Sequence, residues 1–210
     1  MIEIDNYWYT DDRKYRGQVS QEYYPINPRE WDNLGHMICF HDRYNLGDET
    51  TTVSQLEDEV ERKTGETFNM NDWTHVRTFI EEHRGGVLIF PLGLYDHSGI
   101  SMYIGETHDR WDGMPVGFIY VTRDDMIREG IDDLKSAEEV LRHEVKVYNS
   151  YLTGEVYRFD TFMEVNACSC GECKQWEAME CNSEYIDYRE AEKDMKEWLE
   201  KCEPAKEVVK

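Results

Sequence analysis

The sequence lacks any run of about 18 apolar residues, the length that a transmembrane helix needs. Its first residues, MIEIDNYWYTDD, are acidic and contain no apolar segment of the kind found in secretory signal peptides. The length of 210 residues fits one domain, or one domain with a small appendage. We therefore expect a cytoplasmic protein with no membrane partner.

Motifs for nucleotide binding and for the common hydrolases are also missing. The glycine-containing stretches RGG, YIGE and WDGMPVG match neither the Walker A loop nor the dinucleotide-binding fingerprint. The chain has no HExxH, no HxHxDH and no Ser-His-Asp pattern. The sequence therefore does not support nucleotide binding, and any catalytic site must be argued from less specific groupings.

Positive charge is scarce, because 23 lysines and arginines stand against 45 aspartates and glutamates, which gives a net charge of −22. The excess is not confined to a tail, since residues 1–50 carry ten acidic and five basic residues and residues 151–210 carry fifteen and eight. Such a surface repels nucleic acid, because phosphate binding requires Lys and Arg. It would attract a basic protein and compete for a groove that holds DNA or RNA. Taken alone, the charge is explained more simply by solubility or by a salt-adapted host.

Hydrophobic periodicity predicts a mixture of strands and helices. The first 30 residues are expected to be irregular or to hold one short strand. The pattern predicts an α+β fold, with a largely antiparallel central sheet, helices packed on it, a C-terminal cysteine-rich loop and a terminal helix. We expect a single domain, with the α+β core over 1–165 and the loop and last helix over 166–210. Strands are expected over 36–41, 87–95, 99–105, 116–121 and 155–165, and helices over 54–63, 72–84, 123–130, 136–153 and 187–202.

The stretch WDNLGHMICFHDRYNLGD, residues 31–48, places an apolar core between two histidines. It predicts a buried strand followed by a polar turn. His36 and His41 are five residues apart, so they point to opposite faces of a regular strand. They are therefore poor candidates to share one metal ion.

Four of the six cysteines lie close together, in the spacing Cys168-x-Cys170-x2-Cys173-x7-Cys181. Without a secretory signal, such a cluster is more typical of metal ligands or reduced thiols than of disulfides. Thiolates hold Zn²⁺ tetrahedrally, although the first gap here is one residue rather than the usual two. We predict a structural zinc site formed by these four cysteines. The alternative is a hairpin with reduced thiols.

Histidines and aspartates also collect in the turns at strand ends. If the strands over 36–41 and 87–95 pair, their ends converge, and such side chains could hold a divalent metal or perform acid–base chemistry. The alternative function is therefore a metal-dependent hydrolase that acts on a nucleotide or a signalling molecule. Its candidate residues are His41, Asp96, His97 and His108. The segment Asp96–Gly99 is explained more simply as turn chemistry, with an aspartate capping the backbone.

Aromatic residues crowd the N-terminal region with few lysines and arginines among them. This composition favours a protein-binding surface over base stacking. The alternative is that the rings pack as core. The residues are Tyr7, Trp8, Tyr9, Tyr15, Tyr23, Tyr24 and Trp31.

Four separated blocks, PREWDNLGHMICFHDRYNLGD, LGLYDHSGISM, WDGMPVGFIYVTRDDM and LRHEVKVYNSYLTGEVY, together resemble a family of small acidic proteins. That poorly characterised family is encoded by bacteriophages, plasmids and other mobile elements. The resemblance covers roughly residues 25–160 and implies a shared fold. It provides no catalytic residues to transfer, and the cysteine segment departs from the usual family pattern.

The resemblance implies an anti-defence function, similar to that of anti-CRISPR and anti-restriction proteins. Such an inhibitor would present carboxylates where a host defence nuclease expects phosphates, without binding a specific nucleic-acid sequence itself. The even distribution of acidic residues agrees with nucleic-acid mimicry. The acidic residues that we expect to contact the partner are Asp42, Asp48, Asp109, Asp112, Asp124 and Asp125.

Overall fold

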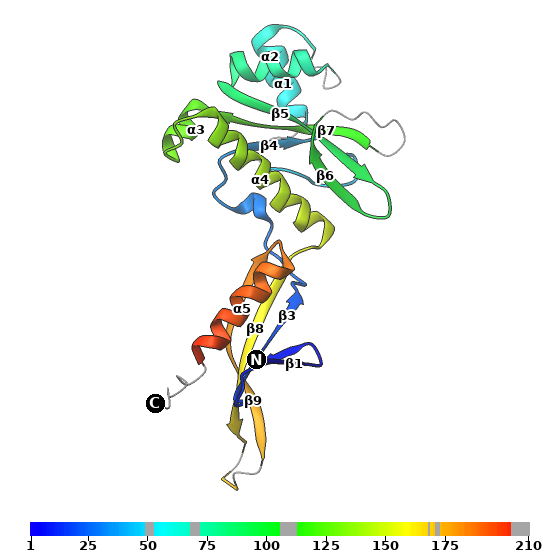
Figure 1. Ribbon diagram of the computed structural model, residues 1–210. Coiled ribbons are helices and arrows are strands. Elements are labelled where there is room, and N and C mark those ends of the chain that lie inside the picture. The colour runs from blue at the N-terminus through cyan, green and yellow to red at the C-terminus, as the bar shows by residue number, and fades with distance from the viewer. Residues whose placement is uncertain (49–52, 68–71, 106–112, 168, 171–172, 203–210) are drawn as a thin grey trace. The chain divides into compact units, whose positions relative to one another are not determined.

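The computed structural model describes residues 1–48, 53–67, 72–105, 113–167, 169–170 and 173–202. The chain forms two compact units (Figure 1). The middle unit is residues 27–153, and the terminal unit combines residues 1–26 with 154–210. This division differs from the expected boundary at residue 165. The reason is that the strand over 157–166 pairs with an N-terminal strand on one side and a C-terminal strand on the other.

Four antiparallel strands form the sheet of the middle unit. Successive residues of one strand, Phe118 and Ile119, belong to different apolar clusters on the two faces of the sheet. Both faces are therefore buried, which explains the unbroken apolar run VGFIYV. The strand order is β4 (His36–Cys39), β7 (Gly113–Thr122), β5 (Gly86–Asp96) and β6 (Ile100–Ile104).

Helices cover both faces of this sheet, as Figure 1 shows. On one face, Leu56 and Ile80 from two helices pack against Phe118. On the other face, Leu141 and Val145 of a long helix join the second apolar cluster. The first pair is α1 (Val53–Thr64) and α2 (Trp73–His83), the long helix is α4 (Leu134–Thr153), and the short elements are η1 (Pro28–Glu30) and α3 (Arg123–Arg128).

The terminal unit is a five-stranded antiparallel sheet with one helix on it. The helix buries Ala191, Met195 and Leu199. The first 30 residues thus contribute three strands, where the sequence led us to expect at most one. The strand order is β1 (Ile2–Ile4), β2 (Tyr7–Tyr9), β3 (Tyr15–Gln21), β8 (Tyr157–Asn166) and β9 (Lys174–Tyr185), and the helix is α5 (Tyr188–Cys202).

Together the two sheets and five α-helices confirm the predicted α+β class and the terminal helix. Both sheets are antiparallel, so the expected single central sheet is divided between two units. Among the described residues, no helix is long and apolar enough to cross a membrane.

Candidate functional site

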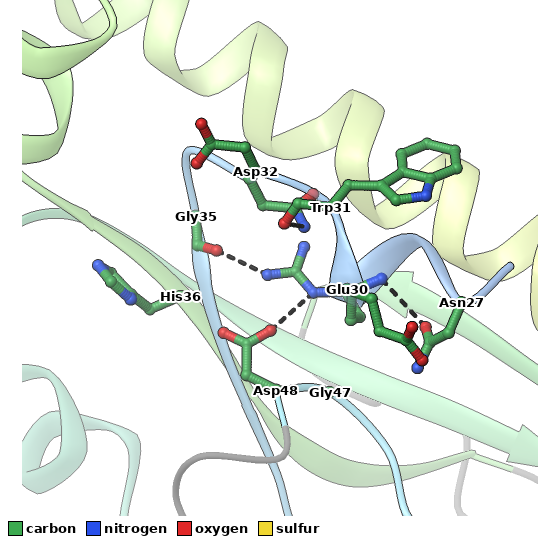
Figure 2. A pocket seen from close by; sticks show the side chains of 10 residues that line it. Asn27, Glu30, Trp31, Asp32, Gly35, His36, Gly47 and Asp48 are labelled. Atoms are coloured by element: carbon green, nitrogen blue, oxygen red, sulfur yellow. Dashed lines mark hydrogen bonds and ion pairs between the residues drawn. The ribbon is translucent and has the colours of Figure 1, made fainter.

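A buried arginine, Arg29, helps to link the segment 27–48 to helix α4, beside the pocket drawn in Figure 2. The side chain of Arg29 is 2% exposed. Its Nε donates to Asp48 at 2.8 Å, one terminal nitrogen donates to Glu144 at 3.0 Å, and the other donates to the Gly35 carbonyl at 2.6 Å. Burial alone would lower the pKa of Arg29, but the two carboxylates outweigh it and raise that pKa. Each of the three guanidinium nitrogens thus donates to an acceptor within the same unit, which gives this buried arginine a structural role.

The two carboxylates on Arg29 also bind backbone amides of the same segment. Glu144 accepts from the amides of Leu34 and Gly35, at 2.7 and 3.2 Å. Asp48 accepts from the amide of Met37 at 2.8 Å. Both carboxylates thus also satisfy backbone amides, those of Leu34 and Gly35 before β4 and that of Met37 within it. The motif NLGH is held in one conformation as a result.

Beside this network lies an open hollow of about 300 Å³. Two of its carboxylates, Glu30 and Asp32, make no ion pair with any described residue. Trp31 is 40% exposed between them in the sequence. The guanidinium of Arg29 already binds two carboxylates, so the hollow combines Glu30 and Asp32 with an exposed indole, which suits a cationic side chain. The hollow is lined by Asn27, Arg29, Glu30, Trp31, Asp32, Asn33, Gly35, His36, Gly47 and Asp48.

His36, at the start of β4, contacts an aspartate, which is a pairing that acid–base catalysis often uses. Its Nε2 lies 2.9 Å from Oδ2 of Asp125, and its ring stacks on Tyr120 with a centroid distance of 5.0 Å. The His36 side chain is 45% exposed. Burial raises the pKa of Asp125, but hydrogen bonds from Thr122 and the charge of His36 outweigh it and lower that pKa overall. Asp125 also completes the capping box of α3 with Thr122, which assigns the carboxylate a structural role.

The predicted hydrolase residues come together only in part. Nε2 of His41 lies 3.9 Å from Asp96, although the strands over 36–41 and 87–95 do not pair, because β7 lies between β4 and β5. However, Nδ1 of His41 accepts the backbone amides of Arg43 and Tyr44, and its side chain is 5% exposed. Arg43 pairs with Asp96 as well. The Nδ1 atom of the imidazole therefore supports the turn, and His41 has a structural role there.

The remaining hydrolase residues add no ligand. His97 is exposed in the hairpin turn, where its backbone amide donates to Gly99 at 3.0 Å. The bond lies within the backbone of the turn, and the Asp96 carboxylate pairs with Arg43 rather than capping the turn. His108 lies outside the described residues. Within the described ranges, no group of three or more His, Cys, Asp or Glu residues is placed to hold a metal ion.

The predicted partner-binding aspartates divide into two classes. Asp42 and Asp124 are exposed. Asp48 and Asp125 are instead committed to Arg29 and to the cap of α3, so we withdraw them as contact residues. Asp109 and Asp112 lie outside the described part of the chain.

The four cysteines of the predicted zinc site are not gathered in one place. Sγ of Cys170 lies 3.6 Å from Sγ of Cys173, while Cys170 is disulfide-bonded and Cys168 lies outside the described residues. Cys181 sits on β9 opposite Asp160, eight residues beyond Cys173. At about 3.3 Å per residue of strand, Cys181 is roughly 26 Å away from Cys173. Cys181 therefore cannot share a metal with Cys173, and zinc bound by the other three stays a prediction that requires reduced thiols.

No family model, curated protein or solved structure matches this chain. The resemblance over residues 25–160 therefore stays a prediction, and the function has to be argued from the chain itself.

Proposed function

We propose that the protein is an anti-defence inhibitor encoded by a phage or another mobile element. It binds a host nuclease in the cytosol by placing carboxylates in the basic groove that normally holds DNA or RNA. The inhibitor performs no chemical reaction in this scheme. The observation that carries the proposal is the set of exposed carboxylates that have no basic partner among the described residues.

Both compact units carry a negative excess. The middle unit has 25 acidic and 12 basic residues, and the terminal unit has 20 and 11. A mimic of nucleic acid needs charge on a folded surface, because the nuclease groove presents its Lys and Arg at fixed positions. The distribution over two folded units supports this function better than a charged tail would.

Helix α1 presents a compact group of carboxylates without an ion pair to a described residue. Glu57, Asp58 and Glu61 are exposed, and none makes an ion pair with a described residue. Glu57 and Glu61 are four residues apart, so they lie on the same side of the helix. Like charges at this spacing destabilise an isolated helix slightly, which a folding role alone does not explain.

Helix α4 provides the matched control group. Its exposed Glu138 pairs with Arg142 at 2.8 Å, and its exposed Glu139 pairs with Lys135 at 3.8 Å. These carboxylates are already partly neutralised by their own helix. They should therefore contribute less to a basic partner than those of α1.

The test is a plating assay on bacteria that carry an active CRISPR or restriction system. The wild-type protein, the triple variant E57Q/D58N/E61Q and the control E138Q/E139Q are produced in the same host. We expect the wild type and the control to restore phage plating, and the α1 variant to restore it at least about tenfold less, because three carboxylates are lost from the surface that faces the basic groove.

A second measurement separates charge mimicry from other kinds of inhibition. The purified protein is mixed with the inhibited nuclease, and binding is measured with increasing salt and with competing duplex DNA. If the protein mimics nucleic acid, salt and duplex DNA must both weaken its binding to the nuclease. DNA competes for the same groove, and salt screens the attraction between the charges. Binding that is insensitive to both would contradict the proposal.

A further inference from the structure

One face of the terminal sheet is left uncovered by the helix of that unit. Met195 of α5 packs against Gly17, and Lys196 lies 3.6 Å above the ring of Trp8, so α5 occupies the face to which these β-strand residues point. Side chains alternate along a strand, so Arg16 points to the opposite face. The register places Tyr9 and Phe162 beside Arg16 on that open face.

On the open face, aromatic rings from several strands surround the Arg16 guanidinium. Its central carbon lies 4.2 Å from the ring centroid of Tyr7, 4.3 Å from Trp176 and 5.2 Å from Phe162. Tyr9 makes an edge contact with Trp176 at 6.0 Å. These rings come from β2, β8 and β9, and we call the group the arginine clasp. Stacking fixes the plane of the guanidinium, and each cation–π contact at a partly exposed site is worth about 0.5–1 kcal/mol.

Arg16 has no anionic partner in the described part of the chain. Its side chain makes no ion pair or hydrogen bond there, and its Nε is buried without any acceptor. The half-buried arginine of the middle unit, Arg84, binds Glu59, and Arg158 on the same open face binds Asp160. An unpaired, partly buried charge is costly, and a chain with 45 carboxylates could readily have supplied a partner.

The carboxylates nearest to Arg16 on this face are already neutralised. Asp160 accepts two hydrogen bonds from Arg158, at 2.6 and 3.2 Å. Glu164 pairs with Lys174 at 2.5 Å. Arg16 therefore remains as the uncompensated positive charge at the centre of this face of the described sheet.

We propose that the arginine clasp binds a carboxylate of an acidic peptide segment that belongs to a partner protein. A guanidinium stacked between rings retains its in-plane hydrogen bonds, which match a carboxylate in a two-pronged arrangement. The rings hold the group in place beforehand, so little side-chain entropy is lost on binding. A nucleic acid is disfavoured, because the binding of a polyanion needs several Lys and Arg, and Arg16 is one uncompensated cation among the described residues of this face.

The edge of the sheet next to the clasp indicates which side chains of the bound segment should flank its carboxylate. Ile2 and Ile4 share the open face with Tyr9 and Tyr7 through the β1–β2 register, and they are 46% and 37% exposed. A segment in which acidic and apolar residues alternate would place its carboxylate on Arg16 and an apolar side chain on these isoleucines. This site is independent of the nuclease-binding carboxylates of the middle unit.

The test follows the indole N–H signal of Trp176 by NMR, assigned with Trp176→Phe. The probe is a blocked peptide of alternating valine and glutamate, and the matched probe replaces glutamate with glutamine. We expect saturable shifts with the glutamate peptide, and binding at least about tenfold weaker for R16Q than for the wild type. R13Q is the control, because Arg13 is an exposed arginine of the same unit without an ion pair to a described residue.

Several results would overturn the proposal. If the glutamine peptide binds the wild type as tightly as the glutamate peptide does, the clasp does not recognise a carboxylate. The same conclusion follows if the glutamate peptide binds R16Q as tightly as it binds the wild type. Tighter binding of inorganic phosphate would assign the clasp to phosphate, and a dimer that dissociates on R16Q substitution would assign the face to a second copy of the chain. If R16Q does not fold, two other comparisons test the proposal. The first is the binding of the two peptides to the wild type, and the second is the binding of the glutamate peptide to R16K, because lysine lacks the two-pronged geometry.

Discussion

Arg29 and Glu144 are 115 residues apart in the sequence, and their side chains form a 3.0 Å ion pair in which the arginine is 2% and the glutamate 9% exposed. The pair joins the η1 segment to the middle of α4. Because Glu144 also holds the amides of Leu34 and Gly35, the contact organises backbone as well as charge.

Removing one partner of this pair should destabilise the protein strongly. Glu144→Gln leaves the buried guanidinium without one of its two carboxylates, and breaking such a pair costs about 3 kcal/mol or more. The measurement is the free energy of unfolding in urea. The control is Glu138→Gln, which removes an exposed pair on the same helix and should cost less than about 0.5 kcal/mol. Equal losses for both variants would contradict the structural role of the network.

The hydroxyl of Tyr148 should be needed for the turn at Gly47. It accepts the Gly47 amide at 3.0 Å in a buried position, and burial is the main reason that its pKa is raised to about 12. Tyr148→Phe leaves that amide unpaired, at a cost of about 1–3 kcal/mol. Tyr151→Phe is the control, because the Tyr151 ring stacks on Tyr148 and its hydroxyl makes no hydrogen bond to a described residue. A thermal melt of both variants is sufficient to compare them.

The ionisation of Asp125 should make the free energy of unfolding depend on pH in the acidic range. Its pKa is lowered below the ordinary 3.8 in the folded state, so its carboxylate contributes stability that is fully present above that value. The contribution is lost as the pH falls through the lowered pKa. The difference in unfolding free energy between the wild type and Asp125→Asn should therefore be constant near neutral pH and shrink below pH 3.8.

Other carboxylates with a lowered pKa, such as Glu59, also make the unfolding free energy depend on pH. Their contribution is the same in the wild type and in Asp125→Asn, so it cancels when the two free energies are subtracted. Asp124→Asn, an exposed neighbour, is the control and should show no comparable loss. A difference that grows on acidification would have the wrong sign for this account.

The cysteines give a test of the zinc prediction. If zinc is bound at the turn before β9, protein purified under reducing conditions should contain it. Cys173→Ser should then lose the metal, whereas Cys181→Ser should retain it because of its position far along the strand. Elemental mass spectrometry measures both. Loss of metal from the Cys181 variant would mean that the strand does not separate these thiols.

Elements with strong local signals were predicted well from the sequence. The strand over 87–95, the hairpin to residue 100 and the helix that follows Asp72 all agree with the structure, because turn and capping chemistry is local. The long helix begins at Leu134, two residues before the expected start, with Asp133 accepting the Ser136 amide at 2.9 Å.

The terminal sheet was largely missed, for a physical reason. Strands β1 and β2 have three residues each and half of β9 is exposed on both sides, so neither carries the alternation that marks a half-buried strand. The Arg29 network and the arginine clasp were also missed. Both join residues that are far apart in the sequence, and one amino-acid sequence does not indicate which distant residues contact each other.

The arrangement of the two units has a consequence for the order of events during translation. Residues 27–153 are contiguous, so everything needed for the middle unit has been made once residue 153 leaves the ribosome. Strand β3 must instead wait for its partner β8, whose register begins at Tyr157. At about 5–20 residues per second this delay is on the order of ten seconds. During that interval the aromatic residues of β2 and β3 have no β8 to pack beside, so the terminal unit is completed only after the whole middle unit has been made.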